Sequence, residues 1–366
     1  MKLPKANKVN SVIYMPGLSI FKRIKAKIKL SANESALGPS PKAKKEYYKT
    51  FKSFNRYPDS EGRVLKETLS KRLKLDQERI ILGSGSDQIL ELACKAFLKK
   101  NDEPYGLDFP VITIRDMVMA QEALLDHFEI EKLLCALGGS MGGMQLLQFC
   151  ASFPNRTFSA VPIACSSSHS AQNIALNELA RQAIMADPEW EKGNYVKTKN
   201  LPKNGLAVAR MAGHISYLSE KGLQEKFGRK LQEKANYEFS FNADFQVESY
   251  LRHQGYSFVD RFDANSYLYI TRAMDYFDLS KQYKNSLSEA FKGNLTKFLV
   301  ISFSSDWLYP TKHSKDIVIA LNASGANVAF AEIKTDKGHD SFLVNEPKFL
   351  TTIKGFIDSS YEVYRK

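Results

Sequence analysis

The sequence predicts an α/β protein built on a parallel sheet with helices on both faces. From residue 105 onward, short apolar segments typical of strands alternate with longer segments whose apolar residues recur at helical spacing. This alternation indicates a parallel sheet, because parallel neighbours need a crossover helix between them. A glycine-rich turn, "GGSMGG" at residues 138–143, lies between one such strand and one such helix. The turn therefore marks the carboxyl end of a predicted strand as a candidate functional position.

The composition is that of a globular protein. The 366 residues are 43% hydrophobic and 25% charged, and they suffice for two ordinary domains or one large one. No window approaches 18 uncharged apolar residues, so we expect no membrane-spanning helix. The four cysteines show no metal or disulfide spacing, which favours a reducing cytoplasm. They are Cys94, Cys135, Cys150 and Cys165.

The net charge of +12 is unevenly distributed. Residues 1–103 carry 23 Lys and Arg against 11 Asp and Glu, so the whole excess lies there, and residues 104–366 are balanced. No basic run contains interleaved aromatics in a nucleic-acid-binding pattern, so we interpret the excess as a solvated surface and expect no nucleic-acid partner. The change of charge suggests that the two segments have different origins.

The expected elements of the first segment are mainly helices. Residues 41–54 and 63–75 have helical patterns, and Pro41 suits a helix start. Residues 79–100 indicate a short strand, a Gly/Ser turn and a further helix, with Asp87 as its N-cap.

The second segment contains the alternating pattern. Strands are expected at residues 131–137, 159–167, 297–305 and 327–334. Helices are expected at residues 113–128, 144–154, 173–186, 264–277, 313–324 and 347–357. A long interval with helical patterns separates the second strand from the third. We predict a helical lid there, about residues 168–294, which would exclude water and shape an acceptor pocket.

The turn fits the pattern G-x-S-x-G, with Ser140 between Gly138 and Gly142. A serine on a sharp strand-to-helix turn has strained backbone angles, so a side chain on either glycine is expected to clash. The N-terminus of the following helix directs backbone N–H groups at charge that develops near the serine. A small residue in an ordinary turn is the alternative, but the strand before and the helix after favour a nucleophile.

An acid and a histidine are expected after such a serine. Asp306 follows the third predicted strand and His339 follows the fourth, and we place no other of the six histidines in such a position. Carboxyl ends of strands are where open parallel sheets bind ligands. We therefore predict a triad of Ser140 as nucleophile, His339 as general base and then acid, and Asp306 as the residue that orients the imidazole.

Residues 104–366 resemble the homoserine O-acetyltransferase family, which has the α/β-hydrolase fold. The resemblance covers nearly all of this segment. Its matching stretches are "YGLDFPVITIRDMV", "LGGSMGGMQ", "RQAIMADPEW", "ARMAGHISYLSE", "FDANSYLYITRAMDYFDL", "ISFSSDWLYP" and "DKGHDSFL".

The resemblance implies that acetyl-CoA, as co-substrate, acylates Ser140 and that the hydroxyl of L-homoserine then takes the acetyl group for methionine synthesis. Arg210 would hold the homoserine carboxylate and Asp340 its ammonium, since one cation and one anion fix a zwitterion. Met141 would supply an oxyanion-hole N–H. No permanently bound cofactor and no metal are implied, relatives suggest a homodimer through lid helices, and the residues leave acetyl-CoA and succinyl-CoA open as donors.

Residues 1–103 resemble the N-terminal part of histidinol-phosphate aminotransferase, a pyridoxal-phosphate enzyme. The stretches "LSANESALGPSPKA", "RYPD" and "ILGSGSDQILELACKAF" carry this resemblance. In that family "GSGSD" opens a helix that helps to bind the cofactor phosphate, and here it would use Ser84 to Asp87. The family's motifs around the Schiff-base lysine are absent from this sequence, so we do not expect aminotransferase activity.

The chain is therefore predicted to be a fusion of two incomplete enzymes joined at residues 101–105. The aminotransferase-like segment replaces the N-terminal strands of the α/β-hydrolase-type sheet, together with a loop that normally gives the second oxyanion N–H. Losing one such donor costs about 2.7–4 kcal/mol. Two alternatives to acetyl transfer stay open: a serine esterase or hydrolase with water as acceptor, and an inactive fusion product.

Overall fold

The computed structural model describes residues 20–21, 24–25, 40–50, 59, 62–73, 76–80, 82, 106–198, 200–232 and 236–365. The chain divides into two compact units, Met1–Asp102 and Glu103–Lys366. Each unit is described by itself below.

The first unit contains short elements. Helix α1 (Pro41–Thr50) has no buried residue, and α2 (Arg63–Leu73) ends close to its predicted end. The remaining elements are β1 (Ile20–Phe21), β2 (Ile24–Lys25) and a 3₁₀ turn, η2 (Gln77–Arg79); β1 and β2 pair antiparallel. The helix predicted after Asp87, the stretch Ser84 to Asp87 and the predicted join at residues 101–105 lie outside the described residues.

The second unit is built on a parallel sheet of four strands in the order β3-β4-β5-β6. The strands are β3 (Leu133–Gly139), β4 (Thr157–Ile163), β5 (Lys297–Phe303) and β6 (Val328–Ile333). Every neighbouring pair is parallel, which confirms the predicted sheet. In the described part of the chain β3 has a strand partner on one side, so it forms an edge of this sheet.

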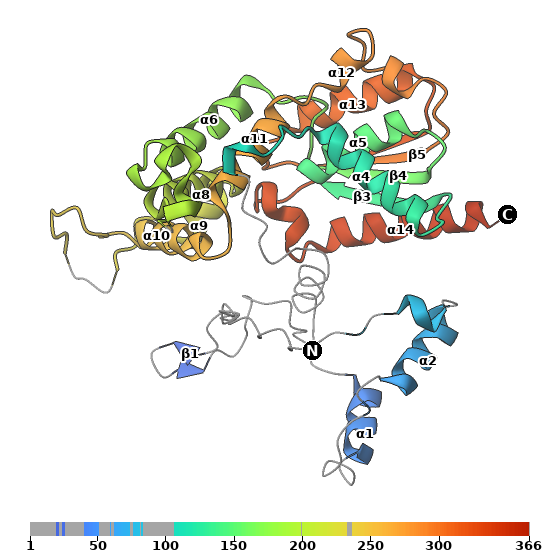
Figure 1. Cartoon of the computed structure of the whole chain (residues 1–366), viewed down its shortest axis with the longest axis horizontal. Helices are drawn as coiled ribbons and strands as arrows, with labels where there is room; N and C mark the ends of the chain where they lie inside the picture. The colour runs from blue at the N-terminus through green and yellow to red at the C-terminus, as the bar shows by residue number, and fades with distance from the viewer. Residues whose placement is uncertain are drawn as a thin grey trace, which may run out of the picture. The chain divides into compact units, whose positions relative to one another are not determined.

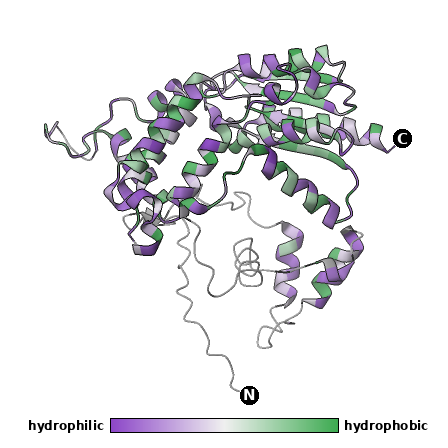
Figure 2. Ribbon diagram, turned by 45° about the horizontal axis from the view of Figure 1, so that its top comes forward, coloured by the Kyte–Doolittle hydropathy of each residue, from purple (hydrophilic) through white to green (hydrophobic). Residues whose placement is uncertain are grey.

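Alternation along the strands supplies both faces of the sheet with apolar side chains. On β5, Phe298 and Val300 belong to one core cluster, whereas Leu299 and Ile301 belong to another. Successive side chains of a strand point to opposite faces, so the continuous apolar run is what a doubly covered strand requires. Figure 2 shows the hydrophobic residues concentrated in these strands and in the helix surfaces that face them.

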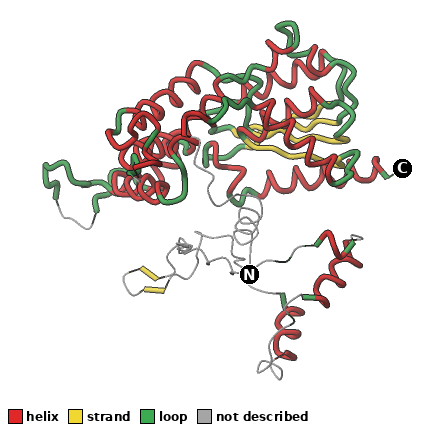
Figure 3. The backbone as a smooth tube through the Cα atoms, viewed as in Figure 1, coloured by secondary structure: helices red, strands yellow, loops and turns green. Residues whose placement is uncertain are grey.

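Helices cover both faces. Helices α4 (Ile114–His127), α5 (Met141–Ser152) and α13 (Thr311–Ala323) share one cluster, which Ile114, Leu147 and Ile317 help to form. Helix α14 (Pro347–Tyr364) covers the other face through Phe349. Figure 1 shows α14 on one side of the strands and α13 on the other, and Figure 3 shows the strands enclosed by helices.

A helical layer separates β4 from β5 in the chain and lies beside the sheet (Figure 1). Its helices are α6 (Ala171–Met185), α7 (Tyr195–Thr198), α8 (Lys203–Tyr217), α9 (Glu220–Lys226), α10 (Gln246–Val259), α11 (Ala264–Asp275) and α12 (Leu279–Gln282). Ile184, Leu206 and Leu268 join three of these helices in a core of their own. The layer occupies the stretch that the sequence assigns to a lid.

Element boundaries differ from the predicted ones where local caps decide them. Helix α5 begins at Met141, directly after the serine, and not at residue 144. Helix α4 begins after Thr113, whose side chain forms a capping box with Asp116. Helix α14 continues to Tyr364, beyond the predicted end at residue 357.

Among the described residues, no helix has both the length and the apolar content to cross a bilayer.

The packing predicts that the central strand carries much of the stability. Ile301 on β5 is fully buried, whereas Ile319 on α13 is 65% exposed. We expect Ile301→Ala to lower the free energy of unfolding by about 2–5 kcal/mol, because the cavity it leaves refills only in part. Ile319→Ala is the matched control and should change this free energy little. Urea denaturation followed by circular dichroism measures both, and equal losses would contradict the described packing.

Candidate active site

The turn between β3 and α5 places Ser140 at the carboxyl end of β3. Ser140 has φ 56° and ψ −122°, a conformation that residues with a side chain rarely adopt. Its backbone is held from both sides, since its N–H donates to the Ile163 carbonyl and its own carbonyl accepts from Gly143 N–H, both at 2.9 Å. The strain is therefore retained by hydrogen bonds to the neighbouring strand and to the helix.

Close packing explains some of the glycines around Ser140. A Cβ on Gly138 would lie 2.1 Å from the Gly142 carbonyl oxygen, and one on Gly143 would lie 2.5 Å from Cys165 Sγ. A Cβ on Gly139 would meet the Phe342 ring at 2.7 Å. The expected clash at Gly142 was wrong, because its missing side chain points into open space with nothing within 4 Å.

Asp306 and His339 lie together at the ends of β5 and β6. His339 Nδ1 is 2.8 Å from Asp306 Oδ2, and both residues are buried. The other carboxylate oxygen accepts from the backbone N–H groups of Leu308 at 3.0 Å and Tyr309 at 2.9 Å. Since an ionised carboxylate only accepts hydrogen bonds, Nδ1 carries the proton and the lone pair is on Nε2. This is the tautomer that a general base needs.

Tyr309 and Phe342 lie between His339 and the serine turn in the described contacts, because each is near both. The His339 ring centroid is 5.2 Å from that of Tyr309 and 5.5 Å from that of Phe342. Tyr309 also lines the same pocket as Ser140, and Phe342 packs against Gly139. Among the described residues, no hydrogen bond joins Ser140 to His339. The structure thus brings acid and base into contact and leaves the serine hydroxyl turned toward a pocket.

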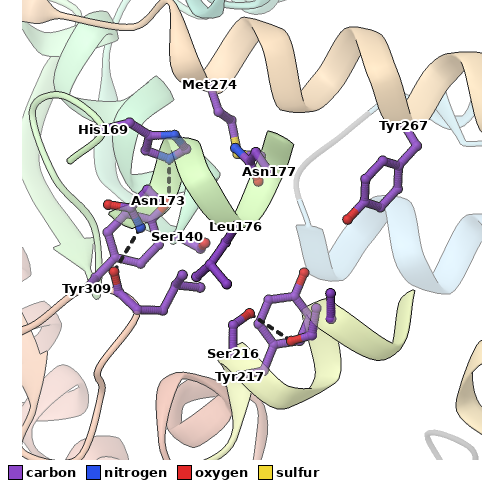
Figure 4. Close-up of a pocket in the computed structure, with 13 residues that line it drawn as sticks. Ser140, His169, Asn173, Leu176, Asn177, Ser216, Tyr217, Tyr267, Met274 and Tyr309 are labelled. Carbon is purple, nitrogen blue, oxygen red and sulfur yellow. Dashed lines mark hydrogen bonds between the residues drawn. The ribbon is translucent and has the colours of Figure 1, made fainter. Parts of the chain in front are cut away.

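Figure 4 shows this pocket between the turn and the helical layer. Ser140, His169 and Tyr309 face it from the sheet edge, while Tyr217 and Tyr267 face it from α8 and α11. Its lining also includes Asn173, Leu176, Asn177, Ala212, Gly213, Ser216, Met274 and Leu308. The pocket therefore lies where the carboxyl ends of the strands meet the helical layer.

Met141 is the first residue of α5. Its N–H is one of the first four of the helix, which have no carbonyl partner within it. The positive end of the helix dipole also points at Ser140. An N–H in this place can donate to an oxyanion formed at the serine.

Arg210 lies on α8, and Asp340 lies in the 3₁₀ turn η6 (His339–Leu343) directly after His339. Arg210 on α8 is 4.7 Å from the Phe258 ring centroid and 5.8 Å from that of Tyr217, and its buried Nε has no hydrogen-bond partner in the described part of the chain. Burial raises the pKa of Asp340, while the charges of His339 and Arg210 act to lower it. The two side chains thus influence one another electrostatically.

Sequence reasoning missed His169 and Tyr309. We placed only His339 just after a strand, but His169 follows the strand predicted at residues 159–167 and lies in the pocket. The same rule that selected Asp306 would have found it. In the described part of the chain, no group of three or more His, Cys, Asp or Glu could hold a metal ion.

The comparisons with known proteins agree with this geometry. The family model of the alpha/beta hydrolase fold matches residues 81–346. A homoserine O-acetyltransferase from Pelagibacter ubique is 64% identical over 260 residues, which are 71% of this chain and 70% of that protein. The chain belongs to the homoserine O-acetyltransferase family. A second member, from Mesorhizobium japonicum, is 61% identical over 258 residues, which are 70% of this chain and 66% of that protein.

Solved structures give the same fold. The crystal structure of a homoserine O-acetyltransferase from Bacillus anthracis superposes with a TM-score of 0.63 at 23% identity, covering 72% of this chain and 68% of that one. Esterase E22 superposes with a TM-score of 0.63 at 25% identity, covering 70% and 69%. The predicted α/β-hydrolase fold class is thus confirmed for this acyltransferase-family chain. The chain spans about two thirds of the length of the relatives it matches.

Gly142 and Gly143 differ in the space that is available for a side chain, so an alanine should affect stability differently at the two positions. We expect Gly143→Ala to lower the free energy of unfolding by about 1–3 kcal/mol, because its Cβ would overlap Cys165. Gly142→Ala should leave stability unchanged or raise it by up to about 1 kcal/mol, since alanine favours the helix and the space is open. Thermal denaturation of the two variants compares them directly, and a Gly142→Ala variant that is the less stable of the two would refute this description.

Proposed function

We propose that this chain transfers an acetyl group from acetyl-CoA to L-homoserine through an acyl intermediate on Ser140. The observation that carries the proposal is the 64% identity to a homoserine O-acetyltransferase, in a chain whose buried Asp306–His339 hydrogen bond lies at the same sheet edge as the serine. The activity supplies O-acetylhomoserine. No permanently bound cofactor takes part, and acetyl-CoA acts as a co-substrate.

The proposed mechanism gives each side chain one task. His339 takes the Ser140 proton through Nε2 while Asp306 holds Nδ1, and the serine oxygen attacks the thioester carbonyl. Met141 N–H stabilises the oxyanion that forms. The bond to the CoA sulfur then breaks, and His339 gives its proton to that sulfur, so that CoA leaves as the thiol and Nε2 is free again. His339 then takes the proton of the homoserine hydroxyl, which attacks the acyl-serine. The ester oxygen of Ser140 leaves and recovers a proton from the imidazolium.

Charges around the pocket support an amino-acid acceptor. Burial, and then the positive charges of Arg210, Lys226 and Arg261, lower the pKa of His214 to about 4, so three cations lie close enough to act on this ring. A carboxylate placed there would pair with Arg210, whose Nε has a free hydrogen in the described part of the chain. Asp340, next to His339, would then hold the ammonium. The pair would fix the acceptor hydroxyl near the base.

A second candidate activity is ester hydrolysis with water as acceptor. Esterase E22 and a homoserine O-acetyltransferase superpose on this chain with equal TM-scores, so the fold is compatible with both chemistries. The two activities differ in whether homoserine accelerates the release of the acyl group.

The first test is therefore acyl transfer by the full chain and by Ser140→Ala. We expect acetyl-CoA turnover that requires homoserine and falls roughly 10⁴-fold or more in Ser140→Ala, because the nucleophile is lost. Replacing acetyl-CoA by succinyl-CoA in the same assay measures donor choice. p-Nitrophenyl acetate hydrolysis that homoserine leaves unchanged would favour the esterase. Absence of both activities in a folded chain would contradict the proposal and favour the alternative of an inactive fusion product.

The second test concerns the acceptor site and its pH dependence. Since burial raises the pKa of Asp340, its carboxylate is protonated at a higher pH than an ordinary aspartate. Protonation removes the partner of the ammonium, so KM for homoserine should rise as pH falls through this raised pKa. Asp340→Asn should raise KM about 10-fold or more at neutral pH and abolish this pH dependence. KM for acetyl-CoA is the internal control, and a parallel change in both KM values would contradict the assignment.

We also propose that residues 1–103 derive from an aminotransferase-like sequence. The motifs "LSANESALGPSPKA" and "RYPD" support this origin, whereas the hydrolase family model already begins at residue 81. Sequencing the DNA across codons 101–105 tests for a junction of two genes.

We further propose that the protein is cytoplasmic and forms a homodimer. The three described cysteines are free thiols, which suits a reducing compartment, and light scattering measures the oligomeric state.

A further inference from the structure

Tyr267 on α11 presents a hydroxyl to the pocket from the helical layer. Its side chain lines the same cavity as Ser140, and Figure 4 shows it extending from its helix toward the other labelled residues. Within the described part of the chain this hydroxyl forms no hydrogen bond, in contrast to the Tyr309 hydroxyl, which is 2.8 Å from His169 Nε2. The pocket wall opposite the serine thus contains a polar group that has no protein partner among the described residues.

The packing of the layer holds the Tyr267 ring in place. The ring lies edge-on to Phe258 and to Phe262, with 6.5 Å and 6.3 Å between the ring centroids. It also packs against the core that the helical layer forms by itself. A tyrosine side chain has only two rotatable bonds before the ring, so this packing fixes the direction of the hydroxyl. A ligand that binds to it therefore loses little free energy to ordering of the side chain.

The Tyr267 hydroxyl is a hydrogen-bond donor at neutral pH. Burial raises the pKa of this phenol above its usual value, so the proton stays on the oxygen. A protonated phenol donates one hydrogen bond. The bond is strongest when the acceptor is an anion, because a charged acceptor roughly doubles the strength of a hydrogen bond.

Arg210 supplies a positive charge beside this donor. Its guanidinium carbon is 4.7 Å from the centroid of Phe258, which is the ring that Tyr267 meets edge-on. The buried Nε of Arg210 has no hydrogen-bond partner in the described part of the chain. A cation and a neutral donor therefore lie around one aromatic ring, and a carboxylate has two oxygens with which to accept from both.

The position of the serine sets the orientation of an acceptor in the pocket. Ser140 is at the carboxyl end of β3, whereas Tyr267 and Arg210 are on helices of the layer. An acceptor hydroxyl has to reach the acyl group on the serine. Its opposite end, which in L-homoserine carries the carboxylate, then extends toward the layer.

We infer that the Tyr267 hydroxyl donates a hydrogen bond to the carboxylate of the amino-acid acceptor, beside Arg210, and so makes the pocket selective for acceptors that carry a carboxylate. Tyr267 is thus a substrate-binding residue and takes no part in proton transfer. The inference rests on the proposed acceptor site and adds a residue to it.

The test is the binding of L-homoserine to the full chain without an acyl donor. Ligand-observed NMR titration measures Kd into the millimolar range. Tyr267→Phe keeps the ring and removes the donor, so we expect Kd to rise about 10- to 100-fold, as for the loss of a hydrogen bond to a charged group. The variant should melt no lower than the unchanged protein, because no described hydrogen bond is lost. An unchanged Kd would overturn the inference.

Tyr276→Phe is the matched control. Tyr276 directly follows α11 and is 61% exposed, and its hydroxyl also forms no hydrogen bond within the described part of the chain. The same substitution at this position should leave Kd unchanged. An equal loss of affinity in both variants would mean that the effect comes from a change in the helix, and not from the hydroxyl in the pocket.

Two analogues identify the group that Tyr267 contacts. 4-Hydroxybutyrate is homoserine without its ammonium, and 3-aminopropan-1-ol is homoserine without its carboxylate. Tyr267→Phe should weaken binding of 4-hydroxybutyrate by the same factor as binding of homoserine. Its effect on 3-aminopropan-1-ol should be absent. A loss for the amino alcohol as large as that for homoserine would overturn the assignment to the carboxylate.

Acetyl transfer by the same proteins separates this inference from the proposed function. Homoserine that binds with the expected dependence on Tyr267 and is not acetylated would refute the proposed reaction and support the inference. Acetylation with an unchanged KM for homoserine in Tyr267→Phe would refute the inference alone. Homoserine that does not bind to the folded, unchanged protein would refute both.

Discussion

The parallel alignment of the strands brings four side chains of the site together at the carboxyl ends of the strands. Because β3, β4, β5 and β6 run in the same direction, the loops that leave their carboxyl ends all open on that side. Each loop carries one polar residue of the site. In strand order these are Ser140, His169, Asp306 and His339. An antiparallel strand in this set would remove one of them to the far end of the molecule.

The helical layer completes the site from the other side. Its helices form a separate core, so the layer can hold Arg210 on α8 and Asp275 on α11 in fixed positions beside the sheet. Asp275 reaches the sheet edge through His169, which gives the two parts a buried polar contact. Such a contact is costly unless every member has a partner. Asn177 donates a hydrogen bond to the Asp275 carboxylate and Arg181 forms an ion pair with it, so the buried charge is compensated.

The strands and the nucleophile turn were accessible from local pattern. The apolar runs gave the four strands, and the order of serine, acid and histidine led to Asp306 and His339. Helix ends were less accessible, because caps such as Thr113 and the start of α5 at Met141 depend on backbone geometry. His169 follows a strand and could have been found by the rule that led to Asp306, but its partner Asp275 is 106 residues away in the chain. No local pattern reveals that contact.

The sequence by itself determined the parallel sheet, the serine turn and the family, because each depends on residue types at short spacing. Only the tertiary structure decided which glycines are crowded, since the obstacle at Gly143 is Cys165 on another loop. It also brought His169 into contact with both Asp275 and Tyr309, because these two residues come from segments that are remote from His169 in the chain.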